Sequence, residues 1–163
     1  MKKNMIIFLA CAAAIIILDQ FTKALIAKKL FMYGTHIVVD GFFNLVYVMN
    51  PGAAFGFLAE MPEFFRYAFF IGITLLAMAL IIYFIIKSEK EPLLIIIALS
   101  LIFGGAVGNL IDRIRFGAVV DFLDFYIGSW HWPAFNVADS AITVGAILML
   151  WQIIFRRKIT KDS

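Results

Sequence analysis

Two aspartates near the C-terminal end of the chain are the residues best placed to do chemistry. Asp121 lies in the apolar stretch 119–122 and Asp139 in the stretch 135–140, each at the edge of a strongly hydrophobic segment. A carboxylate at the rim of a hydrocarbon layer is energetically costly, so such a residue usually serves a function. A turn-rich stretch separates the two aspartates and allows them to meet. Two carboxylates that meet can share one proton and activate a water molecule.

Asp139 and several other polar residues also have simpler structural interpretations. Asp139 also occupies a position suited to a helix cap or a first helical turn, ahead of the apolar residues 141–151. Asp124 is expected to be a solvated loop residue. His36 and His131 are far apart in the sequence and show no ligand spacing, so both are expected to be ordinary loop or interface residues.

A second polar group comes early in the chain. Asp19 and Lys23 are four residues apart, on one helical face, in the order that favours an ion pair. They form either a structural salt bridge near a helix end or one polar wall of a site at the membrane surface. Asn50 and Gly52 belong to a later stretch of small residues, 50–56, which allows close backbone approach but is a weak signal on its own.

A third polar group stands at the end of another apolar segment. Asn109, Asp112 and Arg113 fall at positions i, i+3 and i+4, on one face of a helix. This face either ties a loop to the helix end or contacts a ligand. Small residues just before it would form a smooth helix surface for close packing in lipid: Gly104, Gly105, Ala106 and Gly108.

The composition indicates a membrane protein. Of the 163 residues 64% are hydrophobic, and the mean hydropathy is +0.99, whereas soluble domains are about 45–50% apolar. The net charge is +3, and the basic residues are scattered or stand at the ends of apolar segments, which argues against nucleic-acid binding. Cys11 is the single cysteine, so an intramolecular disulfide and a multi-cysteine metal cluster are excluded.

Four apolar stretches are long enough to cross a membrane as helices, for which about 20 residues are needed. They cover residues 5–27, 64–86, 93–111 and 139–155. The N-terminal stretch has some features of a signal peptide, with a lysine pair before an apolar run and a cysteine. Because only ten residues precede Cys11 and the apolar run continues beyond it, we expect a retained first span.

Two long linkers, residues 28–63 and 112–138, connect the spans. The part 36–48 is rich in Val, Phe and Tyr, which predicts short strands that form a small sheet lying on the membrane. The predicted fold is therefore a mainly α integral membrane protein, a four-transmembrane-helix bundle with a small β-rich segment, in a single domain over residues 1–163. Four spans put both termini on one side. A modest excess of Lys and Arg at the termini and in the turn 87–92 predicts that this side is cytoplasmic, so the linkers are extracytoplasmic.

Taken together, the motifs resemble those of the bacterial lipoprotein signal peptidases, the type II signal peptidases. Five short motifs occur in order between residues 19 and 140, in a chain with four spans and the right length: Asp19-Gln20 with Lys23, Asn50 with the stretch 52–55, the stretch 104–113, the stretch 119–122 and the stretch 135–140. One of these motifs alone would be weak, but five in register are highly specific.

The resemblance implies an aspartyl endopeptidase of the bacterial inner membrane. Such enzymes remove the signal peptide from prolipoproteins by cleaving before a cysteine that already carries a diacylglyceryl group, and they are inhibited by the cyclic peptide globomycin. The family's catalytic dyad maps onto Asp121 and Asp139. The expected substrate-binding or site-supporting residues are Asn50, Gly52, Asn109, Asp112, Arg113, Asn136, Asp19 and Lys23. The resemblance implies no metal and no cofactor, and lipid-modified prolipoproteins and membrane lipid as partners; we expect a monomer with its site near the extracytoplasmic face.

Two functions of other classes remain as alternatives. Carboxylates within the membrane are also used by small proton- or ion-coupled transport subunits. Against this, the sequence shows no pair of broken helices in two matching halves, as many transporters have. The second alternative is a non-catalytic assembly factor in which the aspartates are helix caps. Cleavage of a lipidated precursor by the purified protein would separate all three functions.

Overall fold

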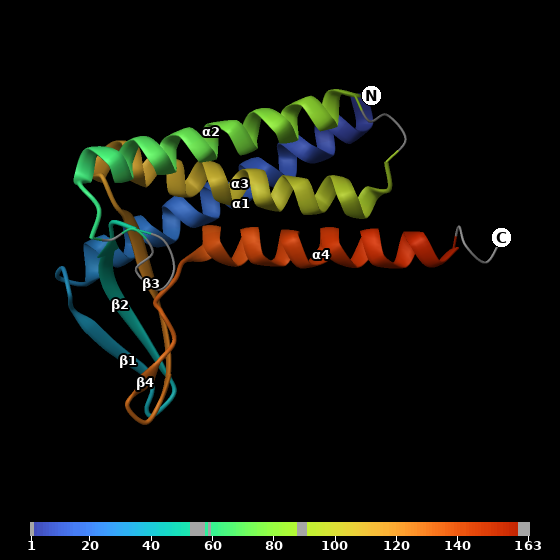
Figure 1. The fold of residues 1–163 in the computed structure, drawn as a ribbon. Helices are drawn as coiled ribbons and strands as arrows, with labels where there is room; N and C mark the ends of the chain where they lie inside the picture. Colours follow the sequence, from blue (N-terminus) through green and yellow to red (C-terminus); the bar gives the residue numbers. More distant parts are fainter. Residues whose placement is uncertain (1, 53–57, 59, 88–90, 160–163) are drawn as a thin grey trace.

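The structure is a computed structural model that describes residues 2–52, 58, 60–87 and 91–159. Within these residues it contains four long helices, each long and apolar enough to cross a membrane. They are α1 (Lys2–Lys29), α2 (Glu63–Lys87), α3 (Leu93–Phe116) and α4 (Val137–Ile159), as Figure 1 shows. The four-helix bundle predicted from the hydropathy of the sequence is thereby confirmed.

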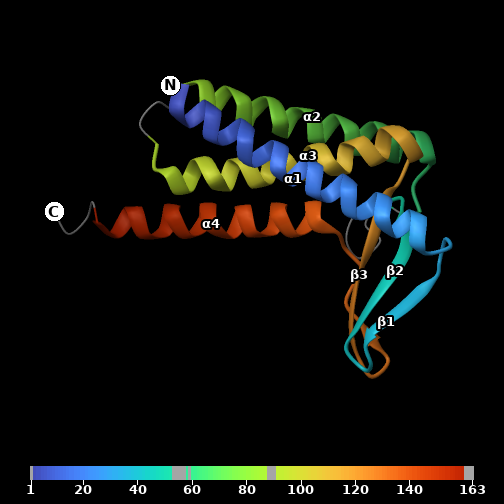
Figure 2. The same cartoon turned by 180° about the vertical axis from the view of Figure 1, so that it is seen from behind.

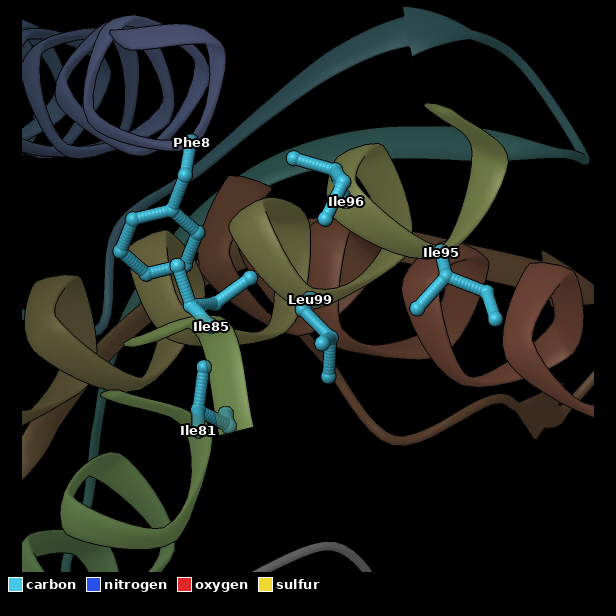
Figure 3. Close-up of a cluster of buried hydrophobic side chains, with 6 residues drawn as sticks. All are labelled: Phe8, Ile81, Ile85, Ile95, Ile96 and Leu99. Carbon is cyan, nitrogen blue, oxygen red and sulfur yellow. The ribbon is translucent and has the colours of Figure 1, made fainter. Parts of the chain in front are cut away.

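Helix α3 is the centre of the bundle, because it packs against α1, α2 and α4. At the end of the bundle near the N-terminus, Phe8 of α1 meets Ile81 and Ile85 of α2 and three residues of α3 (Figure 3). These residues of α3 are Ile95, Ile96 and Leu99. This apolar cluster lies at the opposite end of the bundle from the buried charged side chains of Asp19, Lys23 and Asp112.

The small side chains of α3 allow its neighbours to approach closely. A Cβ added to Gly104 would lie 2.9 Å from the Ala12 carbonyl oxygen of α1, and a Cβ added to Gly105 would collide with the Ala138 carbonyl oxygen of α4. The predicted smooth surface therefore exists. It serves two different helices, one on each side of α3.

An antiparallel sheet lies at the end of the bundle opposite the two chain termini, as Figures 1 and 2 show from opposite sides. Its strands are β1 (Thr35–Val39), β2 (Phe43–Asn50), β3 (Val119–Ile127) and β4 (Trp130–His131), in the order β1-β2-β3-β4. The strands β1 and β2 fall in the region where the Val, Phe and Tyr residues predict a sheet. The small β-rich segment of the predicted fold is confirmed.

The second long linker holds more regular structure than its sequence predicts. Helix α3 continues through Phe116 and ends at Gly117, whose left-handed backbone, with φ of 70°, lets its N–H bond to the Arg113 carbonyl oxygen. Asp112 and Arg113 consequently stand on the last turns of a helix. Strand β3 follows at once and pairs with β2, with Val48 opposite Asp121 and Asn44 opposite Asp124.

Candidate active site

One cavity brings Asp121 of β3 and Asp139 of α4 together. It has a volume of about 500 Å³ and is lined by side chains from both the sheet and the helices. Asn50 and Gly52 contribute from the end of β2, and Asn109 and Arg113 from α3. The lining is completed by Val119, by residues 132–135 and by the α4 residues Ser140, Ile142, Thr143 and Val144.

Asp121 is held by two asparagine side chains. Its Oδ2 accepts a hydrogen bond of 2.8 Å from Nδ2 of Asn50, which ends the neighbouring strand β2. Its Oδ1 accepts a hydrogen bond of 2.8 Å from Nδ2 of Asn136, the residue before α4. Residues of β2 and of the start of α4 both bond this carboxyl group, so its position is well defined. Asp121 is buried, with 2% of its surface exposed.

Asp139 lies in the first turn of α4 and takes part in a reciprocal cap. Its backbone N–H donates to Oδ1 of Asn136 at 2.9 Å, while its own Oδ2 accepts from the backbone N–H of Asn136 at 3.3 Å. This pairing is a capping box, in which the residue before the helix and the third helical residue satisfy each other. The second oxygen, Oδ1, accepts a hydrogen bond of 2.7 Å from Nδ2 of Asn109. The capping role and the site role considered for Asp139 are therefore compatible.

Asn136 links the two aspartates and is completely buried. Its amide nitrogen donates to Asp121, and its amide oxygen accepts from the backbone of Asp139. The same nitrogen lies 3.2 Å from Oδ1 of Asn109 and 3.2 Å from the Val120 carbonyl oxygen. A single residue thus contacts both carboxylates, that of Asp121 through its side chain and that of Asp139 through its backbone N–H.

The surroundings of Asp121 favour its protonated form. Burial, and next the negative charge of Asp139, raise the pKa of Asp121 to about 7. The hydrogen bonds from Asn50 and Asn136 and the positive charge of Lys23 act in the opposite direction without overcoming burial. A carboxyl group that holds its proton near neutral pH, beside another that can be ionised, is the arrangement used for paired acid and base chemistry.

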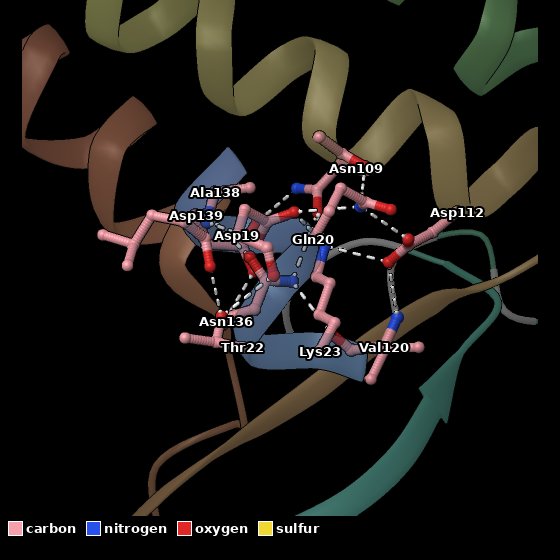
Figure 4. A network of polar contacts seen from close by, with 12 residues as sticks. Asp19, Gln20, Thr22, Lys23, Asn109, Asp112, Val120, Asn136, Ala138 and Asp139 are labelled. Carbon is pink, nitrogen blue, oxygen red and sulfur yellow. Dashed lines mark hydrogen bonds and ion pairs between the residues drawn. The ribbon is translucent and has the colours of Figure 1, made fainter. Parts of the chain in front are cut away.

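Behind the cavity, a buried ion network joins α1 to α3 (Figure 4). Nζ of Lys23 lies 2.9 Å from Asp19 Oδ2 and 2.8 Å from Asp112 Oδ2, with all three side chains almost fully buried. The salt bridge predicted between Asp19 and Lys23 is present. Asp112 also accepts, through the same oxygen, the backbone N–H of Val120 at 3.1 Å, which ties the start of β3 to α3.

Asp19 also reaches the start of α4. Its Oδ1 accepts the backbone N–H of Ala138 at 2.9 Å. A Cβ on Gly108 would lie 2.6 Å from Asp19 Oδ2, so only glycine leaves room for this carboxylate between α1 and α3. The residue next to Asp139 is thereby held by α1, and the polar group on α1 supports the dyad without lining the cavity.

Gln20 belongs to the same network, and the interpretation of the sequence gave it no role. Its Nε2 donates to Asp112 Oδ1 at 3.0 Å and lies 3.2 Å from Asp19 Oδ2 and 3.1 Å from the Gly108 carbonyl oxygen. A signal was available, because an amide side chain next to a carboxylate inside an apolar span rarely occurs without a partner.

Arg113 brings a positive charge to the cavity. Its guanidinium lies 4.8 Å from the centre of the Phe70 ring of α2 and donates to the Gly52 carbonyl oxygen at 3.4 Å. The Gly52 N–H in turn donates to Asn50 Oδ1 at 3.0 Å. The two residues of the small-residue stretch therefore stand beside the helix face that carries Arg113, and the cavity contains a cation close to its two carboxylates.

One expectation for a residue outside the cavity is wrong. Asp124 is not a solvated loop residue, because it lies on β3 and is only 6% exposed. Its Oδ2 accepts from Asn44 Nδ2 at 2.9 Å, and its Oδ1 pairs with His131 Nδ1 at 2.8 Å. His131, expected to be an ordinary loop or interface residue, lies on β4, and His36 is exposed on β1.

The chain is similar to known proteins along most of its length. The family model for signal peptidase (SPase) II matches residues 11–155. A lipoprotein signal peptidase of Syntrophus aciditrophicus (strain SB) is 50% identical over 158 residues, covering 97% of this chain and 98% of that protein. A lipoprotein signal peptidase of Geobacter metallireducens is 49% identical, and the alignment covers the full length of both chains. A solved bacterial membrane enzyme has a TM-score of 0.82 and 35% identity, covering 96% of this chain and 91% of its own.

Proposed function

Since this chain belongs to the signal peptidase II family, we propose that it is a membrane endopeptidase in which Asp121 and Asp139 activate the water that cleaves a prolipoprotein. It is a multi-pass bacterial membrane protein of the aspartic peptidase class. The observation that carries the proposal is the convergence of the two carboxyl groups on one cavity, where Asn136 bonds one through its side chain and the other through its backbone.

We assign different protonation states to the two carboxyl groups. Asp139 lies in the first turn of α4, where the positive end of the helix dipole stabilises a negative charge. Asp121 has its pKa raised to about 7 and retains a proton near neutral pH. Asp139 then removes a proton from the water that attacks the scissile carbonyl carbon, and Asp121 donates its proton to the carbonyl oxygen. The tetrahedral intermediate breaks down when the leaving amine is protonated, with the two carboxyl groups exchanging roles.

The polar side chains around the dyad are suited to holding a peptide. Asn50, Asn109 and Asn136 keep both carboxylates hydrogen-bonded, which reduces the energetic penalty of their burial. Arg113 lines the cavity and can stabilise the negative charge that develops on the scissile carbonyl oxygen. These roles require no group from outside the chain.

The shape of the site suits a substrate that arrives through the membrane. Thr143 and Val144 of α4 line the cavity, and Val144 is 49% exposed. The cavity lining therefore continues into the outer surface of the bundle. A signal peptide in lipid, with a diacylglyceryl group on the cysteine after the cleavage site, could enter from this side. We propose that the sheet end of the bundle faces the extracytoplasmic side of the inner membrane and that both termini are cytoplasmic.

The other functions considered receive less support. The relatives compared above are named as peptidases, so the transport alternative is not supported. We propose that the protein acts as a monomer, because both aspartates and every hydrogen-bond partner described for them come from one chain. Mass measurement of the protein in detergent or nanodiscs tests this proposal.

The test of the function is cleavage by the purified protein in nanodiscs. A prolipoprotein that carries diacylglyceryl on its cysteine is incubated with the protein, and the products are identified by mass spectrometry. We expect cleavage immediately before the lipidated cysteine. The same precursor without the lipid is the control and should be cleaved far more slowly. If the lipidated precursor stays intact with fully folded protein, the proposed function is wrong.

A further inference from the structure

A short irregular segment, residues 132–135, forms one wall of the cavity between β4 and α4. We call it the cavity wall; it consists of Trp132, Pro133, Ala134 and Phe135, all of which line the cavity. It leads directly into Asn136, the residue that links the two aspartates. The position of the cavity wall therefore affects the space for substrate beside the dyad.

The backbone holds the cavity wall at its two ends. The Trp132 N–H donates to the Phe125 carbonyl oxygen at 2.8 Å. At the other end, Phe135 exchanges backbone hydrogen bonds with Leu123, at 2.8 and 3.1 Å. Strand β4, which precedes the wall, spans only Trp130–His131, so few backbone hydrogen bonds attach it to β3. The wall that follows carries two large aromatic side chains.

A pair of side chains strengthens this attachment. His131 of β4 contacts Asp124 of β3 through Nδ1 and Oδ1 at 2.8 Å. The His131 ring also stacks on Tyr126, with centroids 4.9 Å apart and an angle of 7° between the planes. Asp124 is fixed from its other side by Asn44 of β2. The hydroxyl oxygen of Tyr126 accepts the N–H of Gly41 at 2.9 Å, so the attachment extends to the turn between β1 and β2.

We propose that Asp124 and His131 are positioning residues that hold the cavity wall in place for substrate binding. Neither residue is among those that line the cavity. Asp124 is three residues beyond Asp121 on the same strand, which places the two side chains on opposite faces of β3. Asp124 is a buried carboxylate with two side-chain partners, Asn44 and His131, and His131 is the residue directly before the cavity wall. The role of Asp124 and His131 is to determine where Trp132 and its neighbours stand.

The proposal rests on the proposed function and makes a specific kinetic prediction. Loss of the pair should loosen the wall and weaken substrate binding, while the dyad keeps its own hydrogen bonds. In His131→Ala we expect KM for the lipidated precursor to rise by about tenfold, which corresponds to about 1.4 kcal/mol, with kcat nearly unchanged. Asp124→Asn should raise KM in the same direction. His36→Ala, which alters an exposed histidine on β1, is the matched control and should leave both constants unchanged.

A conservative variant separates positioning from a general loss of stability. The amide nitrogen of Asn occupies the place of Nδ1 in a histidine, so His131→Asn keeps a donor for Asp124. We expect KM in His131→Asn to return most of the way from the raised value of His131→Ala to that of the wild-type chain. A rise in KM that is equal in both variants, or a fall in kcat alone, would overturn the proposal.

A second measurement is independent of catalysis. Trp132 is left as the single tryptophan by the changes Trp130→Phe and Trp151→Phe, and its fluorescence anisotropy reports how firmly the wall is held. The anisotropy should fall in His131→Ala and return in His131→Asn. If the wild-type chain does not cleave the precursor, the proposed function fails, and the anisotropy still decides whether the pair holds the wall. Equal anisotropy in all variants would show that it does not.

Discussion

Lys23 donates a hydrogen bond to Oδ1 of Asn109 at 2.9 Å, and this contact decides which end of the Asn109 amide faces the dyad. The same oxygen lies 3.2 Å from the amide nitrogen of Asn136, so it is surrounded by donors. The Asn109 nitrogen is left to donate to Asp139 Oδ1 at 2.7 Å. A buried ammonium group that does not line the cavity thereby orients a ligand of the carboxylate we assign as the base.

Replacing this lysine should lower both stability and activity. Lys23→Met leaves Asp19 and Asp112 buried without their cation, which should lower the free energy of unfolding by about 3–5 kcal/mol. Because the Asn109 amide also loses its fixed orientation, kcat should fall in the protein that remains folded. Thermal unfolding and cleavage rates are the measurements. Lys28→Met, at an exposed position on the same helix, is the control; an equal effect of the two changes would contradict this account.

Removing either carboxylate of the dyad should abolish cleavage. Asp121→Asn and Asp139→Asn keep the size of the side chain. The amide oxygen at either position can still accept some of the hydrogen bonds that the carboxylate accepts. We therefore expect folded, membrane-inserted protein whose cleavage of the lipidated precursor is undetectable above background. Asp40→Asn alters an exposed aspartate and should cleave normally. Near-normal turnover in either dyad variant would show that the assignment of that residue is wrong.

Cleavage should fall as the pH rises through about 7. The reaction needs one protonated and one ionised carboxyl group, and the pKa of Asp121 is raised to about 7. Above this pH the shared proton is lost, whereas at low pH the second carboxylate is protonated, so kcat/KM against pH should be bell-shaped. A rate that stays constant well into the alkaline range would contradict the assignment of Asp121 as the acid.

The same pair can be titrated directly by NMR of the Asp121 carboxyl carbon. In Asp139→Asn the neighbouring negative charge is gone, so the pKa of Asp121 should fall below about 7. It should stay above its ordinary value of 3.8, because burial is the larger cause of the shift and is unchanged. An identical titration with and without Asp139 would mean that the two groups do not interact.

Gly108 should tolerate no side chain. In Gly108→Ala the new Cβ would lie 2.6 Å from Asp19 Oδ2 and push this carboxylate away from the Ala138 N–H. We expect a loss of about 1–3 kcal/mol in stability, as is typical of overpacking, and reduced cleavage. Gly72→Ala on α2 is the control, because nothing lies within 4 Å of its added Cβ. Comparable unfolding temperatures for the two variants would refute the argument.

The proposed orientation in the membrane can be tested by labelling. In a Cys11→Ala background, cysteines introduced at Lys3 and Lys87 should react with an impermeant reagent only from the cytoplasmic side. A cysteine at His36, exposed on β1 at the sheet end, should react from outside. The reverse pattern would place the sheet, and with it the cavity, on the cytoplasmic face.

The helices and the two aspartates could be recognised from the sequence because their signals are local. A run of apolar residues long enough to span a membrane is visible without knowledge of the fold, and a carboxylate at the edge of an apolar segment stands out. The ion pair of Asp19 with Lys23 is likewise a matter of spacing along one helix. Each of these features is contained in one continuous stretch of the sequence.

Strand β3 and the burial of Asp124 depend on pairings between strands that only the folded chain brings together. Asp124 is buried because Asn44 of β2 and His131 of β4 cover it, and neither neighbour can be identified from the residues around position 124. The position of Asn136 between the dyad residues has the same origin, since it requires β3, α3 and α4 to converge. Of the cavity wall, only Phe135 belongs to a motif that the sequence shows, because an irregular segment has no periodic pattern.

The contacts of Lys23 have a consequence for how the chain is inserted during its synthesis. Asp19 and Lys23 stand one turn apart on α1 and pair with each other, so the first helix can enter lipid with its charges matched. Asp112, on α3, finds its cation on α1, a helix made earlier. We therefore expect the Asp112 carboxylate to be stabilised in lipid only once the third helix packs against the first, where Lys23 lies.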